Sequence, residues 1–145
     1  MVASTQRNSK HYRSAMYFTA WQNYDMKLLK FIFSPDAKYI IRNKKRIYTG
    51  IIDIAEYWTR NKKRQRDLTI HWRVLKSGIR FEIVDFTAFF KDIEKWETVK
   101  VNGQIIFKYS AMNKISVLTE AYRKSVCEMI DGEQDVSVQL LKQKM

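Results

Sequence analysis

Two side chains that can exchange protons fall on neighbouring predicted strands. His71 shares one face of an alternating segment with Thr69 and Arg73, and Asp85 interrupts a mostly apolar face of the next segment. An imidazole has an ordinary pKa of about 6.5, so a carboxylate that orients it makes it a proton donor or acceptor near neutral pH. If both faces look into the interior, His71 and Asp85 could form an acid–base pair. The same pattern also fits a half-buried His71 and an Asp85 that pairs with a neighbouring cation such as Arg73.

Aromatic residues make up 14% of the chain and recur on segments predicted to face inward. They could line a pocket for a flat apolar ligand, or they could pack simply as core. The candidates for ligand contact are Trp21, Tyr39, Trp58, Arg73, Phe107 and Tyr109. Tyr17 joins His71 and Asp85 as a candidate catalytic residue, because its hydroxyl can orient a bound molecule.

Metal and cofactor chemistry has little support in the residue pattern. The two histidines, His11 and His71, lie sixty residues apart, and Cys127 is the single cysteine. These spacings match no common metal site, and the chain has no glycine-rich phosphate loop. We expect no metal and no cofactor.

The stretch RNKKR occurs at residues 42–46 and again at residues 60–64, where it continues into Gln65 and Arg66. These two basic runs hold nine of the 27 Lys and Arg residues, so most of the net charge of +12 comes from them. The runs contain no aromatic side chain of the kind that stacks on bases. A solvated turn and a solvated helix end are therefore favoured, with an adaptor for nucleic acid or an acidic protein partner as the alternative function.

A chain of 145 residues is long enough for one ordinary domain. We expect a loose segment over residues 1–10, a single domain over residues 11–126 and a C-terminal extension over residues 127–145. The chain shows no apolar run of membrane-spanning length and no secretory signal, so we expect a cytoplasmic protein with no membrane partner.

Hydrophobic periodicity predicts helices followed by long strands. A broad apolar arc indicates a helix over residues 11–23, and Asp25 can cap a second, short helix. Gly103 is expected to form a bulge inside one long strand rather than a hairpin turn. The predicted strands cover residues 37–41, 46–48, 68–75, 79–91, 96–112 and 115–124, with a third helix starting at residue 51. Several strands are apolar on both faces, which favours a homodimer through the outer face of the sheet.

Three stretches in this order resemble a known family: AWQNYDMKLLKFIFSPDAKYI, RIYTGIIDIAEYW and NKISVLTEAYRK. They are similar to the nuclear transport factor two-like superfamily, which includes SnoaL-like polyketide cyclases and ketosteroid isomerases. The resemblance covers about residues 12–124. It implies a cone-shaped, cystatin-like α+β fold in which three N-terminal helices pack on a strongly curved, mostly antiparallel sheet. It also implies a pocket at the open end and a dimer through the outer sheet face.

The same resemblance bears on the chemistry. Ketosteroid isomerases use a tyrosine of the first helix, an aspartate after the first strand and an acid on the penultimate strand. The tyrosine position is Tyr17, but the two acid positions fall on Ile41 and Ile105. Neither can take a proton, so that mechanism is disfavoured. Some enzymes of the superfamily carry an inward histidine near the position of His71.

The leading hypothesis is therefore a SnoaL-like domain that binds a small, largely apolar molecule. If it is an enzyme, it would be an isomerase, cyclase, dehydratase or hydrolase acting through His71. The sequence does not identify the ligand or decide whether a reaction occurs.

Overall fold

The computed structural model describes residues 11–129 and contains, in this part of the chain, three α-helices, one short 3-10 helix and six strands. In chain order they are α2 (Tyr12–Asn23), α3 (Met26–Ile32), β1 (Phe33–Ile41), η1 (Arg42–Lys44), β2 (Arg46–Thr49), α4 (Ile51–Arg64), β3 (Gln65–Gly78), β4 (Phe81–Asp92), β5 (Glu97–Tyr109) and β6 (Ile115–Met129). The predicted loose segment 1–10 lies outside the described residues. Of the predicted extension 127–145, only residues 127–129 are described, and they continue β6.

Local signals set the helix boundaries. The Asp25 carboxylate accepts a hydrogen bond from the Leu28 amide at 3.0 Å, which starts α3 as predicted. Gly50 precedes α4 with a φ of 89°, a conformation that other residues adopt only under strain. Its amide donates to the Ala37 carbonyl at 2.7 Å, so this turn ties the start of α4 to β1.

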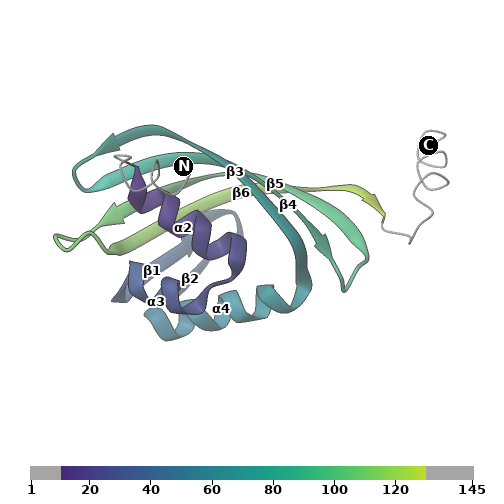
Figure 1. Cartoon of the computed structure of the whole chain (residues 1–145), viewed down its shortest axis with the longest axis horizontal. Coiled ribbons are helices and arrows are strands. Elements are labelled where there is room, and N and C mark those ends of the chain that lie inside the picture. The colour runs from purple at the N-terminus through teal and green to yellow at the C-terminus, as the bar shows by residue number, and fades with distance from the viewer. Residues whose placement is uncertain (1–10, 130–145) are drawn as a thin grey trace.

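The six strands form one mixed sheet in the order β2-β1-β6-β5-β4-β3. All neighbours are antiparallel except β1 and β6, which run parallel. Register shifts interrupt the pairing of β3 with β4 between Arg66 and Thr69 and again between Val74 and Lys76. Such irregularities bend strands. Strands β3, β4, β5 and β6 arch over the helices (Figure 1). The sheet does not close into a barrel, and β2 and β3 are its edge strands.

The helices lie in the hollow of the curved sheet, so one sheet face is core and the other faces outward (Figure 1). Along β4 the side chains of Val84, Phe86, Ala88 and Phe90 are buried, while the alternate positions are half-buried. The buried core formed in this way joins α2, α3 and α4 to β1, β4, β5 and β6, and partly buried residues of β2 and β3 pack against it. The predicted α+β class and the cone-shaped arrangement of three N-terminal helices on a curved sheet are confirmed.

The outer face of the sheet is mixed in character. Ile83 and Ile106 face each other across β4 and β5 and are half-buried, whereas Asn102 and Lys108 on the same face are exposed. The homodimer through this face stays a prediction. Among residues 11–129, every helix falls short of the length and apolar content that a membrane crossing requires.

Gly103 lies inside the continuous strand β5, as predicted, and not in a hairpin turn. The predicted bulge is wrong, because the pairing with β4 and β6 runs through Gly103 without a register shift. The reason for glycine is space. A Cβ atom at this position would lie 2.7 Å from the Ala121 carbonyl oxygen and 2.7 Å from the Phe86 ring. The glycine lets the Phe86 side chain pack directly on the backbone of β5.

We expect Gly103→Val to destabilise the fold by about 1 to 3 kcal/mol, because the neighbouring backbone oxygen cannot move aside as a flexible side chain can. Chemical denaturation measures this free energy of unfolding. Lys108→Ala, an exposed change on the same strand, is the matched control and should stay within about 0.5 kcal/mol of the wild type. Equal stability of the two variants would contradict the role given to Gly103.

Candidate functional site

A cavity of about 130 Å³ lies between α2, α4 and the inner face of the sheet. Four of the predicted ligand-contact and catalytic aromatics line it: Tyr17, Trp21, Tyr39 and Trp58. The other two predicted aromatics do not. Phe107 is fully buried against the Tyr17 ring, and Tyr109 lies near the N-terminal end of α2. Whether the four lining aromatics contact a ligand stays a prediction.

A chain of three buried polar side chains borders this cavity. The Tyr39 hydroxyl donates to the Glu120 carboxylate at 2.9 Å, and the Tyr17 and Tyr39 hydroxyl oxygens are 3.1 Å apart. Because Tyr39 has a single hydroxyl proton and gives it to Glu120, Tyr17 must donate to Tyr39. The order of donation is therefore Tyr17 to Tyr39 to Glu120, from α2 through β1 to β6.

Within this hydrogen-bonded series, Glu120 is the group whose pKa lies near neutral pH. Its side chain is buried, with 6% of the residue exposed, and it lines the cavity. Burial raises the pKa of Glu120 from its usual 4.5 to about 7, while the hydrogen bond from Tyr39 acts in the opposite direction. Near neutral pH the carboxyl group is therefore present in both its protonated and its ionised form, which suits a proton donor or acceptor.

The tyrosines around Glu120 stay protonated. Burial first, and then the negative charge of Glu120, raise the pKa values of Tyr17, Tyr39 and Tyr57 well above the usual value of 10. These hydroxyls therefore act as hydrogen-bond donors at any physiological pH. Their aromatic rings supply the apolar walls of the cavity.

Glu120 lies in the sheet between the two positions at which the ketosteroid isomerase pattern has acids. Glu120 on β6 is the register partner of Ile41 on β1 and also of Ile105 on β5. Ile41 and Ile105 are the two positions at which the resemblance places acids. A single carboxylate thus stands on the strand between them, at the same level of the sheet.

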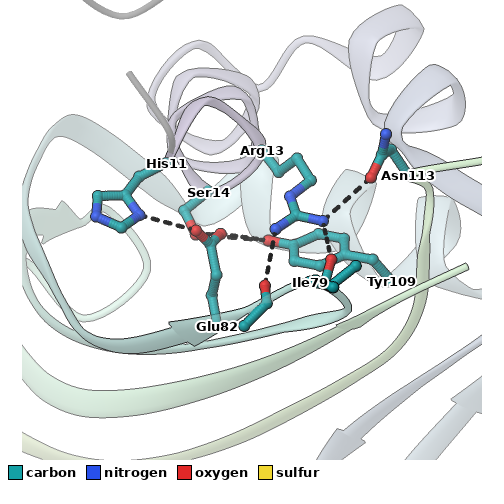
Figure 2. A network of polar contacts seen from close by, with 8 residues as sticks. His11, Arg13, Ser14, Ile79, Glu82, Tyr109 and Asn113 are labelled. Atoms are coloured by element: carbon teal, nitrogen blue, oxygen red, sulfur yellow. Dashed lines mark hydrogen bonds and ion pairs between the residues drawn. The ribbon is translucent and has the colours of Figure 1, made fainter.

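A second buried carboxylate, Glu82, has more hydrogen-bond partners than Glu120 (Figure 2). Glu82 is fully buried and receives hydrogen bonds from Ser14 at 2.5 Å and from Tyr109 at 2.8 Å, and His11 Nδ1 lies 3.0 Å from its other oxygen. These contacts join α2 to β4 and β5, while Arg13 lies over the Tyr109 ring at 4.0 Å. Glu82 has three partners and does not line the cavity, whereas Glu120 has one donor among the described residues and does.

The mouth of the cavity is polar and mostly cationic. Arg64, at the end of α4, donates to the buried Asp92 at 2.9 Å and lies 3.3 Å from Glu94. Burial opposes ionisation of Asp92, but the amides of Glu94 and Lys95 together with Arg64 outweigh it, and the pKa of Asp92 is lowered. Lys44 and Lys124 also line the mouth.

The structure contradicts the inward direction expected for His71 and Asp85. His71 is exposed on the outer face of β3, because Ile70, Trp72 and Val74 of that strand face the helices. Asp85 also faces outward, 3.7 Å from Arg73, which is the ion pair that the sequence offered as the alternative. Arg73 therefore lies on the outer face as well, and none of the three reaches the cavity.

Sequence reasoning missed Glu120, although a signal was present. Glu120 alternates with Leu118 and Tyr122, so it is an acid on a largely apolar strand face. Asp85 shows the same pattern on β4, yet it faces outward. The pattern locates an acid among apolar residues but does not say which face of the sheet is covered by helices. Among residues 11–129, no group of three or more His, Cys, Asp or Glu side chains is arranged to hold a metal ion.

Comparisons with known proteins agree with this geometry at the level of the fold. A putative SnoaL-like polyketide cyclase from Shewanella denitrificans superimposes with a TM-score of 0.71 at 13% identity, over 92% of this chain and 97% of that one. The chain shares its fold with this SnoaL-like protein and with structures described as ketosteroid isomerase-like or cystatin-like. No protein-family model and no curated protein matches the sequence.

Two further solved structures show the range of proteins with this fold. SalBIII, an epoxide hydrolase/cyclase-like enzyme with a role in pyran ring formation in the polyether salinomycin, has a TM-score of 0.67 at 18% identity, with 81% of this chain and 98% of that one covered. A ketosteroid isomerase-like protein from Catenulispora acidiphila, in complex with trimethylamine, has a TM-score of 0.66 at 12% identity over 74% and 82% of the two chains. At these identities the likeness concerns the fold alone.

The raised pKa of Glu120 has a consequence for stability. Below about pH 4.5 the carboxyl group is protonated in both the folded and the unfolded chain. Between that pH and about 7 the unfolded chain loses a proton that the folded chain keeps, so stability falls as pH rises. At about 1.4 kcal/mol per pKa unit, the full loss is about 3 kcal/mol above pH 7.

We therefore expect Glu120→Gln to become progressively more stable relative to the wild type as pH is raised from about 4 to about 8, by up to about 3 kcal/mol. Denaturant unfolding over this pH range measures the difference. Glu56→Gln removes an exposed glutamate and should follow the wild-type profile. Parallel pH profiles for Glu120→Gln and the wild type would show that Glu120 ionises normally.

Proposed function

We propose that the cavity binds a small, largely apolar molecule and that Glu120 exchanges a proton with it. The observation that carries this proposal is a buried carboxyl group that lines a cavity, has one hydrogen-bond donor among residues 11–129 and has a pKa raised to about 7. Buried carboxylates are usually well supplied with donors, and Glu82 accepts hydrogen bonds from two hydroxyl groups. Glu120 accepts the hydrogen bond from Tyr39 on Oε1, so it keeps acceptor capacity for a ligand in the cavity that it lines.

The size and walls of the cavity restrict the ligand. An apolar cavity of about 150 Å³ is large enough for benzene, and this cavity measures about 130 Å³. The enclosed part of a ligand is therefore about one six-membered ring. The surrounding aromatic side chains supply affinity by burial, and the Tyr17 and Tyr39 hydroxyls hold Glu120 in place.

The reaction class that fits best is proton transfer at a carbon next to a carbonyl group. Ionised Glu120 would remove the proton and, once protonated, would return it to another atom. Isomerases, cyclases and dehydratases all use such a step. The proposal therefore specifies the proton transfer at Glu120 and leaves the overall reaction open. Solved structures with this fold are described as cyclase-like and ketosteroid isomerase-like proteins, which is consistent with this reaction class.

Exchange of the α-protons of cyclohexanone in deuterated buffer, followed by proton NMR, tests the proposal without knowledge of the natural substrate. Cyclohexanone has one ring and a carbonyl group, and exchange requires only a base near its α-carbon. We expect the protein-catalysed rate to rise with pH and to level off above about 7, as Glu120 ionises. Glu120→Gln should lower that rate by about 10² to 10⁴-fold.

Two variants make the assignment specific. The hydrogen bond from Tyr39 lowers the pKa of Glu120, so Tyr39→Phe should move the midpoint of the pH profile upward. His71→Ala changes an exposed residue of the outer sheet face and should leave rate and midpoint unchanged. A Glu120→Gln rate equal to that of the wild type would refute the proposed base.

A further inference from the structure

The two RNKKR runs, eighteen residues apart in the chain, meet at one place in the fold. The first forms η1 and the start of β2, and the second forms the last turns of α4. Between them lies a groove of about 480 Å³ lined by Lys44, Arg46, Arg60, Lys63 and Arg64. We call this groove, with these five cationic side chains, the basic groove. Within the described part of the chain, Glu94 is its one acidic lining residue.

The basic groove continues the cavity. Lys44, Tyr57, Asn61 and Arg64 line both. A molecule in the cavity that is larger than one ring can extend past these shared residues into the basic groove. The cavity of about 130 Å³ is smaller than the about 300 to 1,000 Å³ of ordinary ligand sites, so an extension into the larger groove is the natural way to accommodate a metabolite.

The charge of the basic groove is only partly balanced by the protein. Arg64 pairs with Asp92 and Glu94, and Arg60 lies 3.9 Å from Glu56. Among residues 11–129, no carboxylate lies within 4.0 Å of Lys44, Arg46 or Lys63. Partial burial, followed by the charge of Lys95, lowers the pKa of Lys124 at the mouth, and Lys44 and Arg64 contribute in the same direction. The positive charges at this end of the cone thus repel one another in the absence of an anion.

We propose that the basic groove binds the phosphate group of a small phosphate ester whose apolar body enters the cavity. This inference rests on the proposed function, since it assigns a substrate class to the same site. A phosphate ester carries a charge of about −2 near neutral pH, whereas a carboxylate carries a single negative charge. Three cations without a carboxylate partner match the larger charge better, and arginine side chains such as Arg46 can bind two phosphate oxygens at once.

A small ester fits the geometry better than a nucleic acid strand does. The basic groove ends in a cavity that holds one ring. Tyr48 and Tyr57 of the basic groove are stacked on each other, with their ring centroids 4.5 Å apart. Those two rings are therefore already paired, whereas binding of single strands relies on aromatic faces that are open to successive bases.

Calorimetric titration of the full chain at low ionic strength, with 2-phenylethyl phosphate as the probe, tests the inference. We expect this ester to bind at least about tenfold more tightly than 2-phenylethanol, which lacks the anion, and than inorganic phosphate, which lacks the ring. It should also bind more tightly than 3-phenylpropionate, which carries one charge. The inference would be overturned if the ester bound no more tightly than inorganic phosphate or no more tightly than 3-phenylpropionate.

The chain offers a matched pair of variants for the same titration. Arg46→Ala with Lys63→Ala removes two lining cations, whereas Arg42→Ala with Lys62→Ala removes the same charge from the same two runs outside the lining. The first pair should weaken binding of 2-phenylethyl phosphate by about five to tenfold, and the second by less than about twofold. Equal losses would mean that net charge rather than the basic groove attracts the ester, which would overturn the inference.

Two outcomes separate this inference from the proposed function. If cyclohexanone exchanges protons through Glu120 while 2-phenylethyl phosphate binds no better than 2-phenylethanol, the proposed function stands and the phosphate inference fails. If a single-stranded oligonucleotide displaces the ester, binds more tightly and loses affinity in the Arg46→Ala/Lys63→Ala variant, the basic groove is a nucleic-acid site and the inference is likewise overturned.

Discussion

A carboxyl group buried with too few partners is the constraint around which the interior of this protein is arranged. Ionised Glu120 is costly in its buried position, and the one hydroxyl donor found for it among residues 11–129 offsets only part of that cost. The fold could have satisfied the group fully, as it does for Glu82 at the other end of α2. Instead it leaves Glu120 beside a cavity, and the pKa of the carboxyl group there is close to neutral pH.

The curved sheet makes that arrangement possible. Because β6 lies between β1 and β5, a side chain on its inner face is enclosed on both flanks by strands, and α2 and α4 cover it from the hollow side. The parallel contact of β1 with β6 brings Tyr39 beside Glu120. Tyr17 then reaches the same point from α2. Helix α2 and strands β1 and β6 thus each supply one side chain to a single hydrogen-bonded series.

The electrostatics of the site change along its depth. At the bottom, aromatic rings and one carboxyl group of shifted pKa surround the cavity. At the mouth, cations from η1, β2 and α4 gather around the basic groove with few acidic partners. A site of this kind distinguishes the two ends of a molecule, since an apolar body is favoured inside and an anionic group outside. Five of the 27 Lys and Arg side chains of the chain line the basic groove.

The sequence by itself determined the order of the elements and the fold class. The Asp25 cap, the glycine before α4 and the alternation along the strands are local signals, and they sufficed because they act over a few residues. It also identified Tyr17, Trp21, Tyr39 and Trp58, which all line the cavity. Only the tertiary structure decided which face of each strand is covered. Alternation defines two faces, and on β4 and β6 both contain apolar residues, so Asp85 and Glu120 looked alike in the sequence. The packing of α2 and α4 in the hollow of the sheet separates them. It leaves His71 exposed and Asp85 half-buried on the outer face, buries Glu120 and brings the two basic runs together, because contacts between distant segments depend on how the sheet curves.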